Sequence, residues 1–138
     1  MKVYIVRHGQ VPHNALHQYN TTDEDLTEYG VSQAEELKEK IKERSCGSLS
    51  GQPLEATNRE EYWNYYTTIQ YGTSENIQEF FKRVYNFLDE LKTQNYKSVL
   101  IVAHSGVSKA FNGYFEGIKD GKFLNRGLKN CEIKEYEL

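Results

Sequence analysis

The sequence predicts an α/β fold in which two parallel strands lie side by side in an open sheet. Residues 3–6 and 99–103 are apolar and rich in β-branched side chains, which is typical of buried strands. Each strand ends in a histidine, His8 or His104, followed within two residues by a glycine. Ligands of open α/β sheets bind outside the carboxyl ends of the strands, so we expect both imidazoles to face one pocket.

The region after the first strand is predicted to be a loop followed by a helix. Residues 10–25 are polar, and Thr27 is a suitable N-cap for a helix over residues 28–42. Residues 43–53 are rich in glycine, serine and proline and predict a second loop. The apolar positions of the helix recur at helical spacing: Val31, Ala34, Leu37 and Ile41.

The second half of the chain predicts more helices and a final strand. A short helix is expected over residues 59–66, and Ser74 is the expected N-cap of a helix that runs to about residue 92. A third helix is expected over residues 107–117, and the alternation over residues 131–136 predicts a strand at a sheet edge. The buried stripe expected for the long helix is Ile77, Phe80, Phe81, Val84, Leu88 and Leu91.

Length and composition indicate a single globular domain spanning residues 1–138. The net charge is 17 − 20 = −3, which gives no general reason to bind nucleic acid or an anionic membrane. No apolar stretch approaches the roughly 20 residues of a membrane helix, and the N-terminus does not resemble a signal peptide. Cys46 and Cys131 lack metal-type spacing, which favours free thiols in a cytoplasmic location.

The residues at the two strand ends predict an anion pocket that suits phosphoryl transfer. Arg7 is a permanent planar cation that can hold phosphate through two hydrogen bonds, and His8 can act as nucleophile, base or acid. Gly106 precedes a helix, whose free N–H groups favour an anion. Phosphoryl transfer needs positive charge around three oxygens, and a histidine nucleophile would form a phosphohistidine. The leaving group would then need a proton, for which a carboxyl group is a natural donor.

Five blocks of the sequence resemble, in order, the histidine phosphatase superfamily, the group that includes phosphoglycerate mutase. The tripeptide Arg-His-Gly alone is a weak signal, whereas five ordered blocks over most of the chain are a strong one. The blocks are Arg7-His8-Gly9-Gln10 with Asn14, Leu26-Thr27 to Gln33-Ala34, Glu43-Arg44 with Gly47 and Gly51, Ser74-Glu75-Asn76 to Arg83, and Val102-Ala103-His104-Ser105-Gly106.

The resemblance implies a role for each matching residue. His8 would be the phosphorylated nucleophile, and Arg7 and His104 would bind the transferring phosphoryl group. Glu43 matches the proton donor. Further contacts to the substrate are implied for three residues: Asn14, Arg44 and Ser105. No metal and no organic cofactor is expected.

The resemblance also implies a fold, from which this chain departs at one place. The family fold is a three-layer α/β/α sandwich with a mostly parallel sheet. A family segment, Ser-x-Leu-x-Arg-Ala, has no counterpart here because Lys42 runs directly into Glu43. We therefore expect a fold reduced by about one strand and one helix, with one pocket arginine missing. Loss of one preorganised charge contact can cost about 10²–10³ in rate. A missing strand would also expose a sheet edge that a second copy of the chain could cover, so a homodimer is one of the expected alternatives.

The predicted function is hydrolysis of a small phosphate monoester, a phosphorylated metabolite, through a phosphohistidine on His8. An alternative is a catalytically degenerate phosphate-binding or scaffold protein, which the missing arginine favours. A phosphoglycerate mutase is the weaker alternative, because so short a chain has little room for insertions that enclose a bisphosphate.

Overall fold

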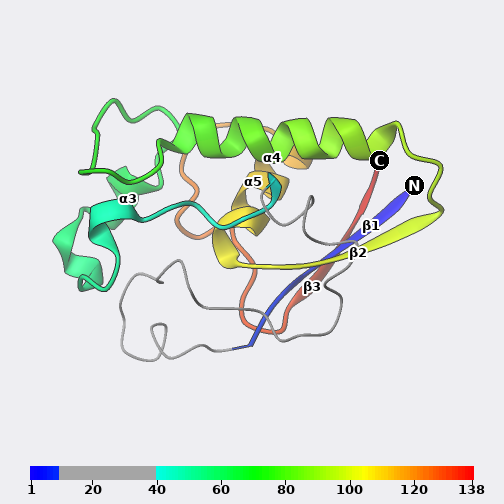
Figure 1. The fold of residues 1–138 in the computed structure, drawn as a ribbon, viewed down its shortest axis with the longest axis horizontal. Helices are drawn as coiled ribbons and strands as arrows, with labels where there is room; N and C mark the ends of the chain where they lie inside the picture. Colours follow the sequence, from blue (N-terminus) through cyan, green and yellow to red (C-terminus); the bar gives the residue numbers. More distant parts are fainter. Residues whose placement is uncertain (10–39) are drawn as a thin grey trace.

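The computed structural model describes residues 1–9 and 40–138, and its centre is a three-stranded sheet (Figure 1). The strands are β1 (Lys2–Arg7), β2 (Ser98–Ala103) and β3 (Ile133–Glu137), in the order β2-β1-β3. β1 pairs parallel with β2, as predicted, and antiparallel with β3. The described sheet is therefore mixed, and the expectation of a mostly parallel sheet is wrong for this part of the chain. β3 lies at a sheet edge, as the sequence predicted.

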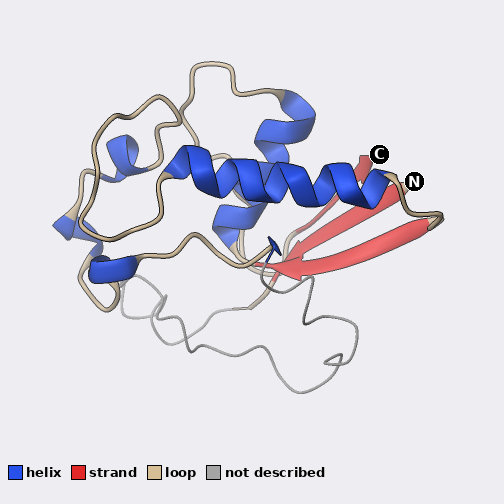
Figure 2. Cartoon of the chain, turned by 45° about the horizontal axis from the view of Figure 1, so that its top comes forward, coloured by secondary structure: helices blue, strands red, loops and turns tan. Residues whose placement is uncertain are grey.

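Two long helices, α4 (Ile77–Lys92) and α5 (Ser105–Glu116), pack together with the sheet around one core (Figure 2). The predicted stripe of α4 is confirmed, because all six of its side chains are buried. The side chains of Val3, Ile5 and Ile101 are buried on the side of the sheet that faces the core. Leu100 and Val102, on the opposite side, are exposed. The described residues thus contain two of the three expected layers. Most of the helix expected over residues 28–42, and the loop over residues 10–25, lie outside the described residues.

The N-cap of α4 is Asn76 rather than the predicted Ser74. The Asn76 side chain accepts hydrogen bonds from the N–H groups of Gln78 and Glu79, at 2.8 and 3.4 Å. Ser74 is buried two residues earlier and makes no such contact with the helix. Both residue types cap helices well, so sequence alone could not choose between them.

Replacing Asn76 by alanine is expected to lower the free energy of unfolding by about 1 kcal/mol, because two N–H groups of the first turn lose their acceptor. Chemical denaturation of the variant and the parent protein measures this difference. Asn86, which lies in the middle of α4, provides the control. An Asn86→Ala change that destabilised the protein as much would contradict a capping role for Asn76.

The segment before α4 forms short turns instead of one longer helix. It contains η1 (Gly47–Leu49), η2 (Leu54–Ala56) and α3 (Arg59–Tyr62). The helix predicted over residues 59–66 stops early because the next residues bond to another part of the chain. Asn64 pairs with Lys122, and the Tyr65 N–H donates to the carbonyl of Gly121 at 2.8 Å. Within the described residues, none of the helices is long and apolar enough to span a membrane.

Candidate active site

The parallel register of β1 and β2 brings the two predicted histidines together. Arg7 is paired with Ala103, and the N–H of His8 donates to the carbonyl of Ala103 at 3.1 Å. Each following residue is a histidine, so both imidazoles leave the sheet at the same edge. Nε2 of His8 lies 2.6 Å from Nδ1 of His104, and the ring centroids are 4.3 Å apart.

The hydrogen bonds of His8 define which of its nitrogens carries the hydrogen and which carries the lone pair. Nδ1 of His8 lies 2.5 Å from the carbonyl oxygen of Gly9, which can only accept, so Nδ1 must carry the hydrogen. In the neutral ring Nε2 then has a lone pair, and Nδ1 of His104 donates to it. Burial, together with the positive charges that His104 and Arg7 can place nearby, lowers the pKa of His8 below its ordinary value. The neutral imidazole, whose Nε2 is nucleophilic, is therefore favoured at pH 7.

Arg7 lies beside this pair with part of its guanidinium uncommitted. Its Nη1 donates to the carbonyl of Leu128 at 3.0 Å, which fixes the side chain. Its Nε is buried and has no hydrogen-bond partner among the described residues. A buried donor without a partner is costly, and an anion at the strand ends would satisfy it.

Glu43 reaches the N-terminus of α5, the helix that begins directly after His104. Its Oε2 accepts a hydrogen bond from the N–H of Gly106 at 2.8 Å, and its Oε1 accepts one from the N–H of Arg44 at 2.7 Å. A Cβ at position 106 would lie 1.9 Å from Oε1 of Glu43, so only glycine permits this approach. The structure thus places a carboxyl group at the same helix end as His104.

Arg44 does not have the geometry of the substrate contact expected from the resemblance. The side chain is only 4% exposed, and its guanidinium donates to the carbonyl oxygens of Glu75 and Tyr62 at 2.8 and 2.6 Å. It also lies 3.8 Å above the centre of the Tyr62 ring. These contacts favour a structural role, in which Arg44 joins the loop after Glu43 to α3.

Glu75 and Arg83 hold the same loop from the other side. Nε and Nη2 of Arg83 donate to the two carboxylate oxygens of Glu75 at 2.7 and 2.9 Å. Arg83 also donates to the carbonyl of Glu43 at 3.0 Å, and Glu75 accepts from the N–H of Ser45 at 3.0 Å. The pair therefore fixes the backbone on both sides of Arg44, and with it the position of Glu43.

The change Glu75→Gln is expected to lower the free energy of unfolding by about 1–2 kcal/mol, because a two-bond ion pair that is mostly shielded from water loses its charge. Thermal and urea denaturation measure the loss. Glu79→Gln, on the first turn of α4, is the matched control. Equal stability of the two variants would contradict an anchoring role for Glu75.

The remaining predicted site residues divide between the described and the undescribed parts of the chain. Ser105 is the first residue of α5, and its Oγ accepts a hydrogen bond from Nζ of Lys109 at 3.0 Å. Asn14 lies outside the described residues. Lys109 was not identified from the sequence. Its position four residues after Ser105, and so on the same face of the helix, is the sequence feature that could have indicated it. Among the described residues, no three His, Cys, Asp or Glu side chains gather as metal ligands would.

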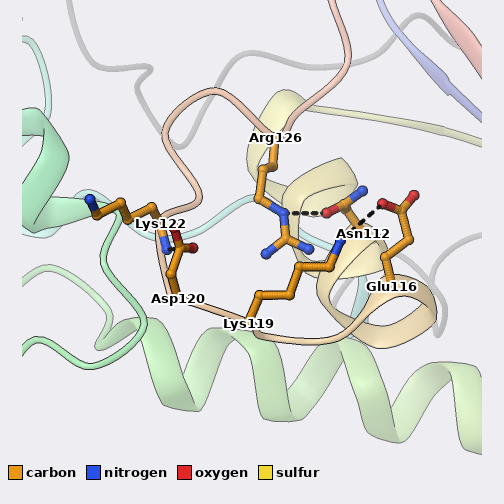
Figure 3. A pocket seen from close by; sticks show the side chains of 6 residues that line it. All are labelled: Asn112, Glu116, Lys119, Asp120, Lys122 and Arg126. Carbon is orange, nitrogen blue, oxygen red and sulfur yellow. Dashed lines mark hydrogen bonds and ion pairs between the residues drawn. The ribbon is translucent and has the colours of Figure 1, made fainter.

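Two hollows on the surface of the described residues lie away from the histidine pair, which lines neither of them. One, of about 580 Å³, lies beside the C-terminal end of α5 (Figure 3). There Arg126 donates to Asn112 and to the carbonyls of Gly117 and Ile118, so its guanidinium is already satisfied. The other, of about 340 Å³, lies where Glu43, Glu75 and Arg83 meet. The candidate site is thus defined by its side chains and not by either of these hollows.

Comparison with known proteins identifies a family and a relative that are similar to this chain in sequence. The sequence model of the histidine phosphatase superfamily (branch 1) matches residues 3–49 and 36–138. A protein named "Putative phosphoserine phosphatase 2" from Hydrogenobacter thermophilus is 31% identical over 109 residues, which cover 74% of this chain and 53% of the relative. The chain therefore spans about half the length of the curated relative that it matches.

Solved structures show the same fold at low sequence identity. An alpha-ribazole phosphatase from Shigella flexneri has a TM-score of 0.72 at 18% identity, covering 100% of this chain and 91% of that one. YhfR from Bacillus stearothermophilus also gives 0.72, at 16% identity, covering 99% and 91%. A phosphoglycerate mutase from Thermus thermophilus gives 0.66 at 20% identity, covering 98% and 92%. These similarities identify a phosphoglycerate mutase-like α/β fold.

Proposed function

Since the chain belongs to the histidine phosphatase superfamily (branch 1), we propose that it hydrolyses a small phosphate monoester through a phosphohistidine on His8. The observation that carries this proposal is the 2.6 Å approach of Nδ1 of His104 to Nε2 of His8. It sets a nucleophilic nitrogen beside a hydrogen-bond donor at the carboxyl ends of two parallel strands. A phosphoryl group placed there meets both at once.

The first chemical step transfers the phosphoryl group to His8. The Nε2 lone pair forms a bond to phosphorus while the bond from phosphorus to the ester oxygen breaks. The N–H of His104 and the free donor of Arg7 turn to the phosphoryl oxygens and stabilise their charge. The carboxyl group of Glu43 gives its proton to the departing oxygen, which leaves as an alcohol.

The second step returns the enzyme to its starting state. Water attacks phosphorus, the bond from phosphorus to Nε2 breaks, and inorganic phosphate forms. The Glu43 carboxylate, now without its proton, takes one from the attacking water. Each step is a displacement at phosphorus, so the substrate loses its phosphate without any change of redox state.

The substrate class is a small phosphorylated metabolite. The name of the Hydrogenobacter relative makes phosphoserine one ester to include among candidates. A phosphoglycerate mutase remains the second enzymatic alternative, and the Thermus thermophilus mutase is matched over 92% of its own chain. Cys46 and Cys131 are free thiols, which fits a cytoplasmic enzyme.

The second candidate function is a phosphate-binding protein without turnover. It is favoured by the absence of a counterpart to the arginine segment of the family, since one fixed positive charge of the pocket is then missing. Such a protein would keep the histidine pair and bind phosphate. It would not form a covalent intermediate at a useful rate.

Incubation with p-nitrophenyl phosphate, and with phosphoserine, separates the two candidates. A phosphatase releases inorganic phosphate catalytically, and quenching with an alkaline denaturant during turnover traps a phosphoprotein that is labile to acid and stable to base. A phosphate-binding protein shows thermal stabilisation by inorganic phosphate without release of product. No turnover and no trapped label, in a folded protein that phosphate stabilises, would overturn the phosphatase proposal.

A further inference from the structure

Lys109 is a buried cation that the reaction outlined above does not use. It lies on the second turn of α5 and is only 5% exposed. Its Nζ turns back toward the start of the helix, where it donates to Oγ of Ser105 at 3.0 Å. It also lies 4.9 Å from the centre of the Trp63 ring. The ammonium therefore sits beneath the first turn of α5, next in space to the residue that follows His104.

The backbone of residues 127–128 covers this ammonium and connects it to Arg7. A Cβ at Gly127 would lie 2.8 Å from Nζ of Lys109 and 2.6 Å from Oγ of Ser105, so the backbone passes directly over both groups. The next carbonyl, that of Leu128, accepts the hydrogen bond from Nη1 of Arg7. Lys109 lies against the same short stretch of chain to which Arg7 is hydrogen-bonded.

We propose that Lys109 is a positioning residue of the anion pocket, which orients the Ser105 hydroxyl toward a bound phosphoryl group and adds a fixed positive charge behind it. An ammonium has donors and no acceptor, so it occupies a lone pair of Ser105 Oγ and leaves the hydroxyl proton for another acceptor. No described residue accepts that proton. The proposal rests on the proposed function for the identity of the anion as phosphate.

The cost of burying this charge supports a ligand as its missing partner. Burial, with the positive charges of Arg59 and Arg7, lowers the pKa of Lys109 to about 8, although the charge of Glu43 acts in the opposite direction. Its only hydrogen-bond acceptor among the described residues is Ser105. Buried charges are normally paired and hydrogen-bonded, and a phosphate dianion at the start of α5 would provide that compensation.

Variants at three positions test the proposal through the dissociation constant of inorganic phosphate, measured by isothermal titration calorimetry at pH 7. Lys109→Met should weaken binding about 10–100-fold, the usual range for one lost charge-assisted contact. Lys109→Arg, which keeps the positive charge, should stay within about 3-fold of the parent protein. Lys82→Met, at an exposed position on α4, should change nothing. Ser105→Ala should cost less when added to Lys109→Met than when made alone, because the two groups act as one unit.

The parent protein supplies a test that needs no substitution. Its affinity for phosphate should fall as the pH rises above about 8, because the Lys109 ammonium loses its proton, whereas inorganic phosphate has already become the dianion at that pH. In Lys109→Arg this decline should be absent. The charged groups that face Lys109 are Arg7 at the end of β1, Glu43 before η1 and Arg59 on α3.

The outcomes separate this proposal from a purely structural lysine and from the phosphatase proposal. Unchanged phosphate affinity in a folded Lys109→Met, or an affinity of the parent protein that is flat from pH 8 to about 9.5, overturns the positioning role. Equal losses of affinity and of melting temperature in the Met and Arg variants overturn it as well. Phosphate binding that follows these expectations without any turnover contradicts the phosphatase proposal alone, because the readout is binding.

Discussion

Replacing His8 by asparagine is expected to lower the turnover of a phosphate ester about 10⁴-fold or more, the scale seen when a covalent nucleophile is removed. Asparagine preserves the polarity and approximate volume of the side chain but has no lone pair able to form the covalent bond. The trapped phosphoprotein should disappear with the activity. Initial rates with p-nitrophenyl phosphate and the yield of acid-labile label measure the two effects.

His104→Asn is the informative control for this experiment. It removes the donor that faces Nε2 of His8 at 2.6 Å but leaves the nucleophile in place. We expect a smaller loss of about 10²–10³-fold, because one charge-stabilising contact is lost, with a phosphoprotein that still forms slowly. Both variants should keep the melting temperature of the parent protein within a few degrees. Residual activity equal in His8→Asn and the parent protein would remove His8 as nucleophile.

Glu43→Gln is expected to reduce turnover by about 10²–10⁴-fold for alkyl phosphates and far less for aryl phosphates. A glutamine cannot give a proton to the departing oxygen, and alkoxides need that proton much more than nitrophenolate does. The amide oxygen can still accept from the N–H of Gly106, whereas the N–H of Arg44 loses its acceptor, so the melting temperature is measured beside the kinetics. The measurement is kcat/KM for phosphoserine and for p-nitrophenyl phosphate, in both proteins.

The dependence on the leaving group distinguishes acid catalysis from a structural role of Glu43. A structural defect would lower both rates by the same factor, and this result would contradict the assignment. Gly106→Ala is a second route to the same group, because its methyl would displace the Glu43 carboxyl. It should reproduce the selective loss on alkyl phosphates while the histidine pair stays intact.

Local sequence patterns were sufficient to predict the elements that carry the chemistry. The strands that lead to His8 and His104 could be predicted because buried parallel strands are continuous apolar runs in the sequence. Parallel pairing then places both histidines at the same edge of the sheet. The buried stripe of α4 could be predicted because the helical spacing of its apolar residues is maintained over 16 residues. Their joint consequence, two imidazoles in contact, was therefore predictable.

Features that depend on distant partners were not predictable in the same way. The end of α3 is set by the pairing of Asn64 with Lys122, which no local pattern reveals. The structural position of Arg44 depends on carbonyls of Tyr62 and Glu75, and a buried Lys109 contradicts the usual exposure of lysine. The antiparallel pairing of β3 with β1 likewise depends on the whole topology, so the mostly parallel sheet was wrong.

The alignment of Arg7 with Ala103 makes the histidine pair a reporter of folding. The two rings come from positions 96 residues apart in the sequence, and they meet only after β2 has docked beside β1 in the correct register. Such long-range pairing carries a high loop-closure cost and is typically a slow event. Under the proposed function, the first release of phosphate from an ester during refolding would therefore mark the time at which β2 docks beside β1.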